Sequence, residues 1–345
     1  MTRNTPRSRR ELLSETLAIG AVLASARPLA AAFPTEDPVG QALIAITLDL
    51  EMSRHYPTWD QTHWDYEKGN LDADTKGYAV EAARLVKKRG GLIHFFLVGR
   101  VLEQENVDWL RALIREGHSL GNHTYDHVNV KATQPDQVQF RFERAPWLIE
   151  GKTPSQVIAE NIRITSRAMR QRLGIDPAGF RTPGGFNDGL SDRPDVQEMI
   201  RGLGFEWVSS KYPAHPLGPE GVSPTNEVFD GILKAEELAQ PFVYRSGLVE
   251  VPMSPISDVT AFRSGRWPLA AFLKAVRLGV SWAIERRAVF DLLVHPSCLL
   301  VADPEFRAIS LICDLVQEAG DRAALVDLGT IAQRARQQAA AKGAL

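Results

Sequence analysis

The chain has 345 residues, of which 44% are hydrophobic and 24% are charged, and its formal net charge is -2 at pH 7. This composition excludes a disordered or low-complexity protein, and nothing in it favours a nucleic-acid-binding protein. The two cysteines, Cys298 and Cys313, are too few for a disulfide framework, and the sequence leaves open whether they pair.

The first 32 residues have the pattern of a secretory signal. The adjacent arginines Arg9 and Arg10 precede a short apolar run at 17–24, and an Ala-x-Ala site follows it. Adjacent arginines at this place are typical of the Tat export route, although an amphipathic helix is the alternative. We therefore predict a signal peptide at 1–32, a linker at 33–40, and a periplasmic or extracytoplasmic protein with no stable membrane span after cleavage.

Short apolar runs alternate with helical patterns along the rest of the chain. We expect strands at 43–48, 92–98, 205–208, 248–251, 290–294 and 323–326, and helices at 78–89, 107–116, 155–173, 194–203, 269–285 and 304–319. This alternation predicts parallel strands with crossover helices, and functional loops at the carboxyl ends of the strands. No Gly/Ser-rich linker divides the chain, so we predict one catalytic domain at 41–336, followed by a tail at 337–345.

Residues with metal-binding chemistry occur at two places. Asp49 and Glu51 end the first predicted strand, and their spacing puts both carboxylates on one side of an extended chain. Taken alone, this pair fits two solvated carboxylates better. Further on, His123 and His127 are four residues apart, which predicts two imidazoles on one face of a helix. Two histidines and one carboxylate would make a three-ligand metal site with an open position.

The order of these motifs resembles the NodB-homology polysaccharide deacetylases, carbohydrate esterase family four. The segments that carry the resemblance are 47–51, 91–99, 116–127, the Arg-Thr-Pro-Gly-Gly sequence at 181–185 and the Leu-Val-His sequence at 293–295. The resemblance covers most of residues 41–330. It implies an α/β fold, namely a distorted, incomplete (β/α) barrel of about seven strands, of the glycoside hydrolase/deacetylase type.

The resemblance also implies a metal site. His123 and His127 would bind a divalent metal, for which Zn²⁺ is our first expectation and Co²⁺, Ni²⁺ or Fe²⁺ are alternatives. The family's metal-binding aspartate, which is adjacent to its catalytic base, is replaced by Leu50, and leucine cannot bind a metal. We therefore assign Glu51 as the third ligand and Asp49 as the catalytic base.

Three further roles follow from the resemblance. Arg181 would keep Asp49 ionised and oriented, because a nearby cation favours a charged carboxylate; a surface arginine is the alternative. His295 would protonate the leaving amine, since imidazole titrates near neutral pH; a core histidine is the alternative. A backbone N–H of the turn at Gly184 and Gly185 would hold the oxyanion, although the family usually has tyrosine at the first of these positions.

Two features leave the site incomplete. The family usually supplies an acidic partner for the catalytic histidine near an Asp-x-x-x-Trp motif, and this chain offers only Phe-Glu-Trp around Glu206. Glu206 and Asp291 are therefore both candidates for the partner. Trp59 and Trp64 follow the first motif and are expected to stack against sugar rings, with loop packing as the alternative.

The expected function is hydrolysis of a non-peptide carbon-nitrogen bond, most simply N-deacetylation of an N-acetylated cell-wall or extracellular polysaccharide. One alternative is an allantoinase-like hydrolase of a small cyclic amide or ureide, which the Asp-x-Glu pattern favours and export argues against. The other is a non-catalytic, metal-containing carbohydrate-binding barrel. We expect an N-acylated carbohydrate as the substrate and no nucleic acid as a partner; the polymer, the acyl group and the oligomeric state stay open.

Overall fold

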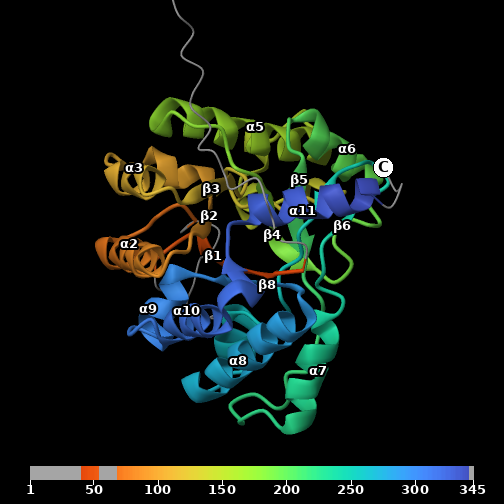
Figure 1. Cartoon of the computed structure of the whole chain (residues 1–345). Coiled ribbons are helices and arrows are strands. Elements are labelled where there is room, and N and C mark those ends of the chain that lie inside the picture. The colour runs from red at the N-terminus through yellow and green to blue at the C-terminus, as the bar shows by residue number, and fades with distance from the viewer. Residues whose placement is uncertain (1–39, 54–67, 342–345) are drawn as a thin grey trace, which may run out of the picture. The chain divides into compact units, whose positions relative to one another are not determined.

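The computed structural model describes residues 40–53 and 68–341, and their central element is a curled, nine-stranded sheet (Figure 1). Its strands are β1 (Ala42–Leu50), β2 (Ile93–Leu97), β3 (Ser119–Asn122), β4 (Phe180–Phe186), β5 (Trp207–Lys211), β6 (Phe242–Val243), β7 (Val249–Glu250), β8 (Val289–Val294) and β9 (Ala323–Leu325). Their order is β6-β7-β5-β4-β3-β2-β1-β8, with β9 also paired to β1. The predicted α/β incomplete barrel is confirmed, and it has nine strands where about seven were expected.

The barrel is open between the two ends of this order, because the described residues form no strand ladder between β6 and β8. Side chains bridge the gap instead. The amide of Gln240 donates to Val289 O at 3.0 Å and accepts from Val289 N at 2.9 Å. Ser254 and Asp291 pair in the same manner, through Ser254 N to Asp291 O and Asp291 N to Ser254 Oγ, both at 3.0 Å. These bonds satisfy backbone groups of β8 that a further strand would otherwise pair.

β1 is the most enclosed strand of the sheet. It pairs with β8 along one edge, and with β9 at its start and β2 at its end along the other. All nine of its residues are buried. A nearly continuous apolar run is what a strand covered on both faces requires, which explains why its sequence shows no polar alternation before Asp49.

Helices pack against the curled sheet, most of them on its outside (Figure 1). They are α2 (Ala73–Lys88), α3 (Asp108–Arg115), α4 (Phe140–Arg144), α5 (Pro154–Leu173), α6 (Pro194–Gly202), α7 (Asn226–Glu236), α8 (Leu269–Arg286), α9 (Pro296–Ala302), α10 (Arg307–Ala319) and α11 (Leu328–Ala341), with short turns η2 (Gly99–Glu103), η3 (Pro135–Gln137), η4 (Pro146–Leu148), η5 (Val259–Ser264) and η6 (Gly320–Arg322). The longest, α5, begins with a capping box of Thr153 and Gln156 and ends at Gly174 in the left-handed conformation.

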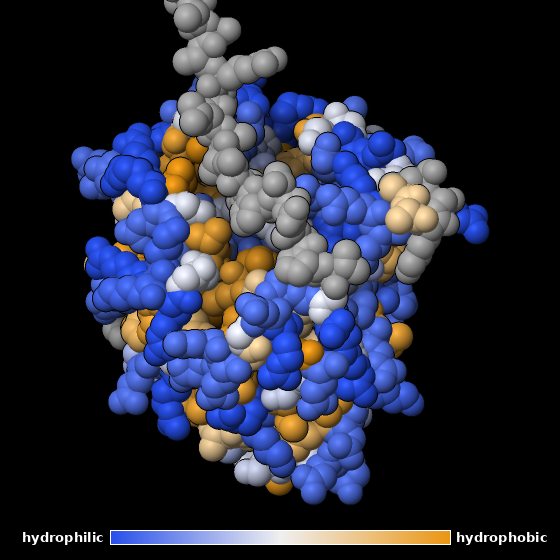
Figure 2. Space-filling view, viewed as in Figure 1, coloured by the Kyte–Doolittle hydropathy of each residue, from blue (hydrophilic) through white to orange (hydrophobic). Residues whose placement is uncertain are grey.

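The two faces of β1 belong to different cores. Its even-numbered residues, such as Ile46 and Leu48, pack in the larger core beneath the helices α2, α8 and α10. Leu43 and Ala45 instead pack in the barrel interior with residues of α11, among them Leu328. The remaining odd-numbered positions therefore face the interior as well. On the visible outer face, hydrophilic side chains predominate (Figure 2), as expected of helices that bury their apolar stripes.

Several predictions fall on residues 1–39, 54–67 or 342–345, which lie outside the described part of the chain. The signal peptide, the linker and the stacking role of Trp59 and Trp64 therefore stay predictions. Among the described residues, no helix is long and apolar enough to cross a membrane. Cys298 and Cys313 are both buried and both carry free thiols.

Candidate active site

A cavity of about 290 Å³ lies at the carboxyl ends of the central strands, where a parallel barrel normally carries its functional loops. Its walls comprise Asp49, Glu51, Lys68, His127, Arg181, Thr182, Gly184, Gly185, Tyr212, Met253, Ser257, Val259, Arg263, Leu293 and His295. His123 is not among these residues, but its Nε2 lies 3.0 Å from Oε1 of Glu51, which is. The structure therefore brings together all the predicted site residues that it describes.

The alternation of side chains along β1 decides which carboxylates reach the cavity. Asp49 and Glu51 continue the interior-facing positions and are 4% and 6% exposed, respectively. Leu50 points the opposite way and is buried in the larger core beneath the helices. A carboxylate at position 50 would therefore lie in an apolar core, so that position 51 is the one able to supply a ligand.

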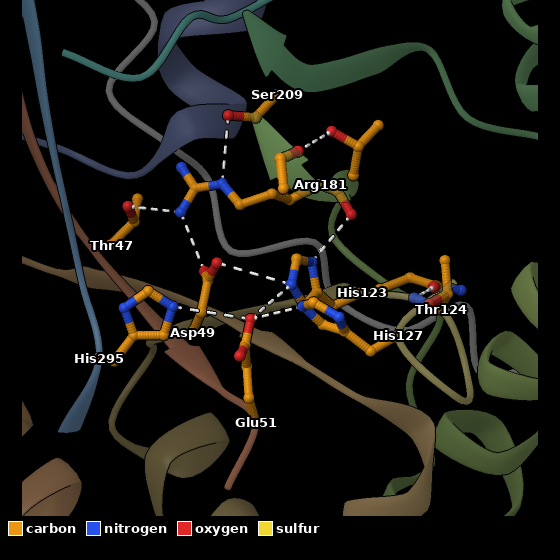
Figure 3. Close-up of polar contacts among 12 residues, drawn as sticks. Thr47, Asp49, Glu51, His123, Thr124, His127, Arg181, Ser209 and His295 are labelled. Atoms are coloured by element: carbon orange, nitrogen blue, oxygen red, sulfur yellow. Dashed lines mark hydrogen bonds and ion pairs between the residues drawn. The ribbon is translucent and has the colours of Figure 1, made fainter. Parts of the chain in front are cut away.

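Three candidate metal ligands converge on one point (Figure 3). Glu51 Oε1 lies 3.0 Å from His123 Nε2 and 2.9 Å from His127 Nε2. The other ring nitrogen of His123, Nδ1, lies 3.0 Å from the backbone oxygen of Arg181. Nδ1 must be the donor in that contact, which leaves the lone pair of Nε2 directed at the cluster. Such a bond to a second group is what orients histidine ligands in metal sites.

The two histidines do not lie on a helix, so this prediction was wrong. His123 directly follows β3, and the chain then turns through two non-glycine residues with positive φ, Thr124 at 59° and His127 at 61°. Each costs about 1 kcal/mol or more in an L-residue. Side-chain bonds hold the turn, from Thr124 N to Asn122 Oδ1 at 2.8 Å and from Val128 N to Thr124 Oγ1 at 3.0 Å. A four-residue spacing thus brings the imidazoles together through a specific loop.

The protonation of this cluster suits a divalent cation. Burial lowers the pKa of His127 to about 4, so its imidazole is neutral at neutral pH. Burial opposes ionisation of Glu51, but His127, Lys68 and His295 hold the pKa of Glu51 well below its ordinary value. Two imidazoles and one carboxylate, all within 4.8 Å of one another, form a donor set typical of an open divalent-metal site. These residues fit the predicted metal.

A lysine that the sequence analysis missed completes the cluster. Lys68 Nζ makes an ion pair with Glu51 Oε2, the oxygen that does not contact the histidines, and Lys68 is only 5% exposed. Its position is fixed by the adjacent backbone, since Ser53 N donates to Asn70 O at 2.9 Å and Gly69 N donates to Glu51 O. No motif marks this lysine, because the bonds join segments separated in sequence.

Asp49 is held by a buried arginine, as predicted. Arg181 Nη1 donates to Asp49 Oδ1 at 3.0 Å, and Arg181 is 0% exposed, so it is not a surface arginine. The same guanidinium donates to Thr47 Oγ1 at 2.7 Å and to Ser209 Oγ at 3.2 Å (Figure 3). Arg181 Nη2 donates to Asp291 Oδ2 at 2.6 Å.

His295 has a different partner from the two that the sequence offered. Its Nδ1 lies 3.0 Å from Asp258 Oδ1, and its backbone N donates to Asp258 Oδ2 at 2.8 Å. Asp291 is instead bonded to Arg181, and Glu206 lies on the surface, where it pairs with Arg336 at 2.9 Å. Both candidates were therefore wrong.

Asp258 supplies the charge that the acid needs. Burial by itself lowers the pKa of His295, but the neighbouring carboxylates of Asp258 and Glu51 raise it to about 10, so the ring holds two protons at neutral pH. Asp258 precedes the π-helical turn η5, an irregularity frequent at functional sites. The sequence around it carries no tryptophan motif, and nothing in the spacing could have selected it.

The predicted oxyanion turn also lines the cavity. The pairing of β4 with β5 breaks between Arg181 and Phe186, so the turn departs from the regular ladder. Gly184 has φ of +74°, which favours glycine. A Cβ at Gly185 would lie 2.4 Å from the Cβ of Tyr212, so only glycine allows this close approach.

The family model for polysaccharide deacetylases matches residues 66–199. This part of the chain matches the polysaccharide deacetylase family, which its motifs resemble. The deacetylase match includes His123, His127 and Arg181, whereas β1 with its carboxylates precedes it and His295 follows it. Among curated protein sequences, none matches the chain significantly.

Solved structures share the fold along nearly the whole chain. A candidate polysaccharide deacetylase from Mycobacterium smegmatis is 18% identical with a TM-score of 0.58, covering 89% of this chain and 94% of that protein. One from Pseudomonas aeruginosa PAO1 is 13% identical with a TM-score of 0.58, covering 87% and 92%. The Puue allantoinase is 11% identical with a TM-score of 0.57, covering 91% and 96%. Likeness at these identities concerns the fold and does not choose between the two activities.

Proposed function

We propose that the protein is a metal-dependent deacetylase that removes the N-acetyl group from an N-acetylated carbohydrate polymer. One observation carries this proposal: a proton acceptor and a proton donor meet at a single candidate metal site. Asp49 Oδ2 lies 3.7 Å from His123 Nε2, and His295 Nε2 lies 3.6 Å from Glu51 Oε1. Amide hydrolysis needs this combination, because water must lose a proton and the leaving nitrogen must gain one.

The metal would be held by Glu51, His123 and His127. When bound, a divalent ion supplies Lewis acidity that polarises an amide carbonyl and makes water a stronger acid. Zn²⁺ is the first expectation, and Co²⁺, Ni²⁺ and Fe²⁺ are alternatives that the same ligands accept.

The chain's own residues then move the protons. Asp49, which accepts a hydrogen bond from Arg181 Nη1, takes the proton of the attacking water. His295 donates from Nε2 to the leaving nitrogen, which departs poorly as an anion. Asp258 holds the Nδ1–H of the same ring, so that Nε2 faces the cavity. Backbone N–H groups of the turn at Gly184 and Gly185 are proposed to bind the oxyanion.

The family match supports an acetylated carbohydrate as the substrate, and the predicted Tat signal would bring the enzyme to cell-wall or extracellular polymers. Trp59 and Trp64 remain the proposed platforms for sugar rings. Hydrolysis of a small cyclic ureide is the second candidate, because the allantoinase fold is as similar as the deacetylase folds are.

The test combines metal content with two substrates. The purified full-length protein is analysed for bound metal, then assayed for acetate release from N-acetylated glycans and for hydrolysis of a cyclic ureide, before and after chelation. We expect about one metal ion per chain and acetate release that chelation abolishes and added metal restores. Ureide hydrolysis without acetate release would favour the second candidate, and activity that survives complete metal removal would contradict the proposed metal site.

A further inference from the structure

Arg181 is shared between two buried carboxylates rather than paired with one. Nη1 donates to Asp49 at 3.0 Å, and Nη2 donates to Asp291 at 2.6 Å. Asp49 is 4% exposed and Asp291 is 1% exposed. The guanidinium also stacks over the ring of Phe96 at 4.4 Å. The guanidinium is therefore hydrogen-bonded along its edge and packed against an aromatic ring on one face.

Asp291 lies beneath the cavity and does not line it. It is on β8, where it is the register partner of Ala45, one inward-facing layer before the site. Its backbone is fixed by two bonds to Ser254, whose hydroxyl in turn donates to Glu236 Oε1 at 2.7 Å. Asp291 is thus a rigid support that cannot touch a substrate in the cavity.

A guanidinium is planar and carries its donors in a fixed fork, so bonds at two nitrogens determine where the third points. In this site Nη2 is fixed by Asp291 and Nε by Ser209, at 2.6 and 3.2 Å. These two bonds set the plane of the guanidinium and aim Nη1 at the carboxylate of Asp49.

We propose that Asp291 is a positioning residue that acts through Arg181 to hold the catalytic base Asp49 in its reactive orientation. The proposal rests on the proposed hydrolase function for its kinetic consequence, and on geometry alone for the shared arginine. It predicts a loss in the chemical step without a loss in substrate or metal binding, because Asp291 contacts neither the cavity nor the ligands Glu51, His123 and His127.

The kinetic test uses Asp291→Asn, which keeps the shape of the side chain and removes its charge. We expect kcat for acetate release to fall by about 10- to 100-fold, the loss typical of a displaced catalytic group, with KM and metal affinity unchanged. The matched control is Glu250→Gln, at a carboxylate that is likewise buried but is bonded to Ser210, Lys211 and Tyr244. An equal fall in kcat for both variants, or parallel changes in KM and metal affinity, would overturn the proposal.

A second test needs no activity. Urea unfolding is measured for Asp49→Asn, Asp291→Asn and the double variant. Loss of both carboxylates leaves the buried guanidinium without a counter-charge, so the unfolding constant of the double variant should exceed the product of the single effects by about fivefold or more. An unfolding constant of the double variant that equals the product of the single effects would contradict the shared arginine. If the wild-type protein releases no acetate, the proposed function fails. The comparison of the single and double variants still decides whether Asp49 and Asp291 share Arg181.

Discussion

The two sides of the site hold their proton-transfer residues in different ways. On the base side, Asp49 depends on Arg181, which is itself bonded to Thr47, Ser209 and Asp291 from three different strands. On the acid side, one carboxylate binds both the ring and the backbone of His295. The base is thus supported through several bonds to one arginine and the acid by a single residue, so removing the Thr47 bond should reduce activity less than removing Asp258.

The largest effect is expected from the base itself. Asp49→Asn removes the proton acceptor but keeps its shape, so kcat for acetate release should fall by about 10²- to 10⁴-fold, the usual contribution of a general base. Thr47→Val, which removes one of several bonds to Arg181, is the matched variant and should change kcat by less than about threefold. Steady-state kinetics with metal-loaded protein measures both, and equal losses would contradict a distributed support.

The next effect concerns the acid side. Asp258→Asn should lower kcat by about 10- to 100-fold, because a neutral amide neither orients nor stabilises a protonated His295. Glu206→Gln, at the partner candidate that the structure rejects, should leave kcat unchanged. Metal content measured alongside should stay the same in both variants, and activity that survives in Asp258→Asn would remove this residue from the site.

A smaller effect is expected in the ligand cluster, where Lys68 makes an ion pair with Glu51. Lys68 competes with a metal for the charge of Glu51, so Lys68→Met should bind Zn²⁺ more tightly by about tenfold, whereas Lys68→Arg should behave like wild type. Competition with a fluorescent chelator measures the affinity. Weaker binding by Lys68→Met would mean that the lysine serves mainly to orient the carboxylate.

Glu236, which is bonded to Ser254 beneath the base, should make the stability of the fold depend on pH. Burial raises the pKa of Glu236 to about 8, far above its value in an unfolded chain, so the folded state holds one more proton between about pH 5 and pH 8. Stability should therefore fall by up to about 1.4 kcal/mol per pH unit as pH rises through this window. Glu236→Gln should flatten that slope in urea unfolding. Glu227→Gln, on the exposed face of the same helix, should leave it unchanged.

Much of the fold could be predicted because it depends on local patterns. Long apolar runs such as β1 and β8 were evident, and so were helices with clear caps such as α5. The strands β3 and β4 were not predicted. β3 has only four residues and contains glycine, and β4 contains proline and two glycines, so neither has the alternation or the composition of a strand.

The residues of the site also divide into those that local sequence patterns mark and those that they do not. Asp49, Glu51, His123, His127, Arg181 and His295 stand in motifs and could be named from the sequence. Lys68, Asp258 and Asp291 act through contacts between distant segments, and no spacing marks them. Their roles depend on which strand edges and loops become neighbours, and the sequence alone does not give that information.

The enclosed position of β1 has a consequence for the motions of the site. Backbone amides of a strand paired along both edges exchange with solvent only when the whole domain opens, whereas the amides of Thr124 and Val128, in the turn that carries the histidines, donate to side chains and can open locally. Hydrogen exchange should therefore be slow around Asp49 and faster around the histidines. A metal added to the protein would be expected to slow exchange in the loop and leave β1 unchanged, so that Glu51, directly after β1, serves as the fixed template on which the two histidines order.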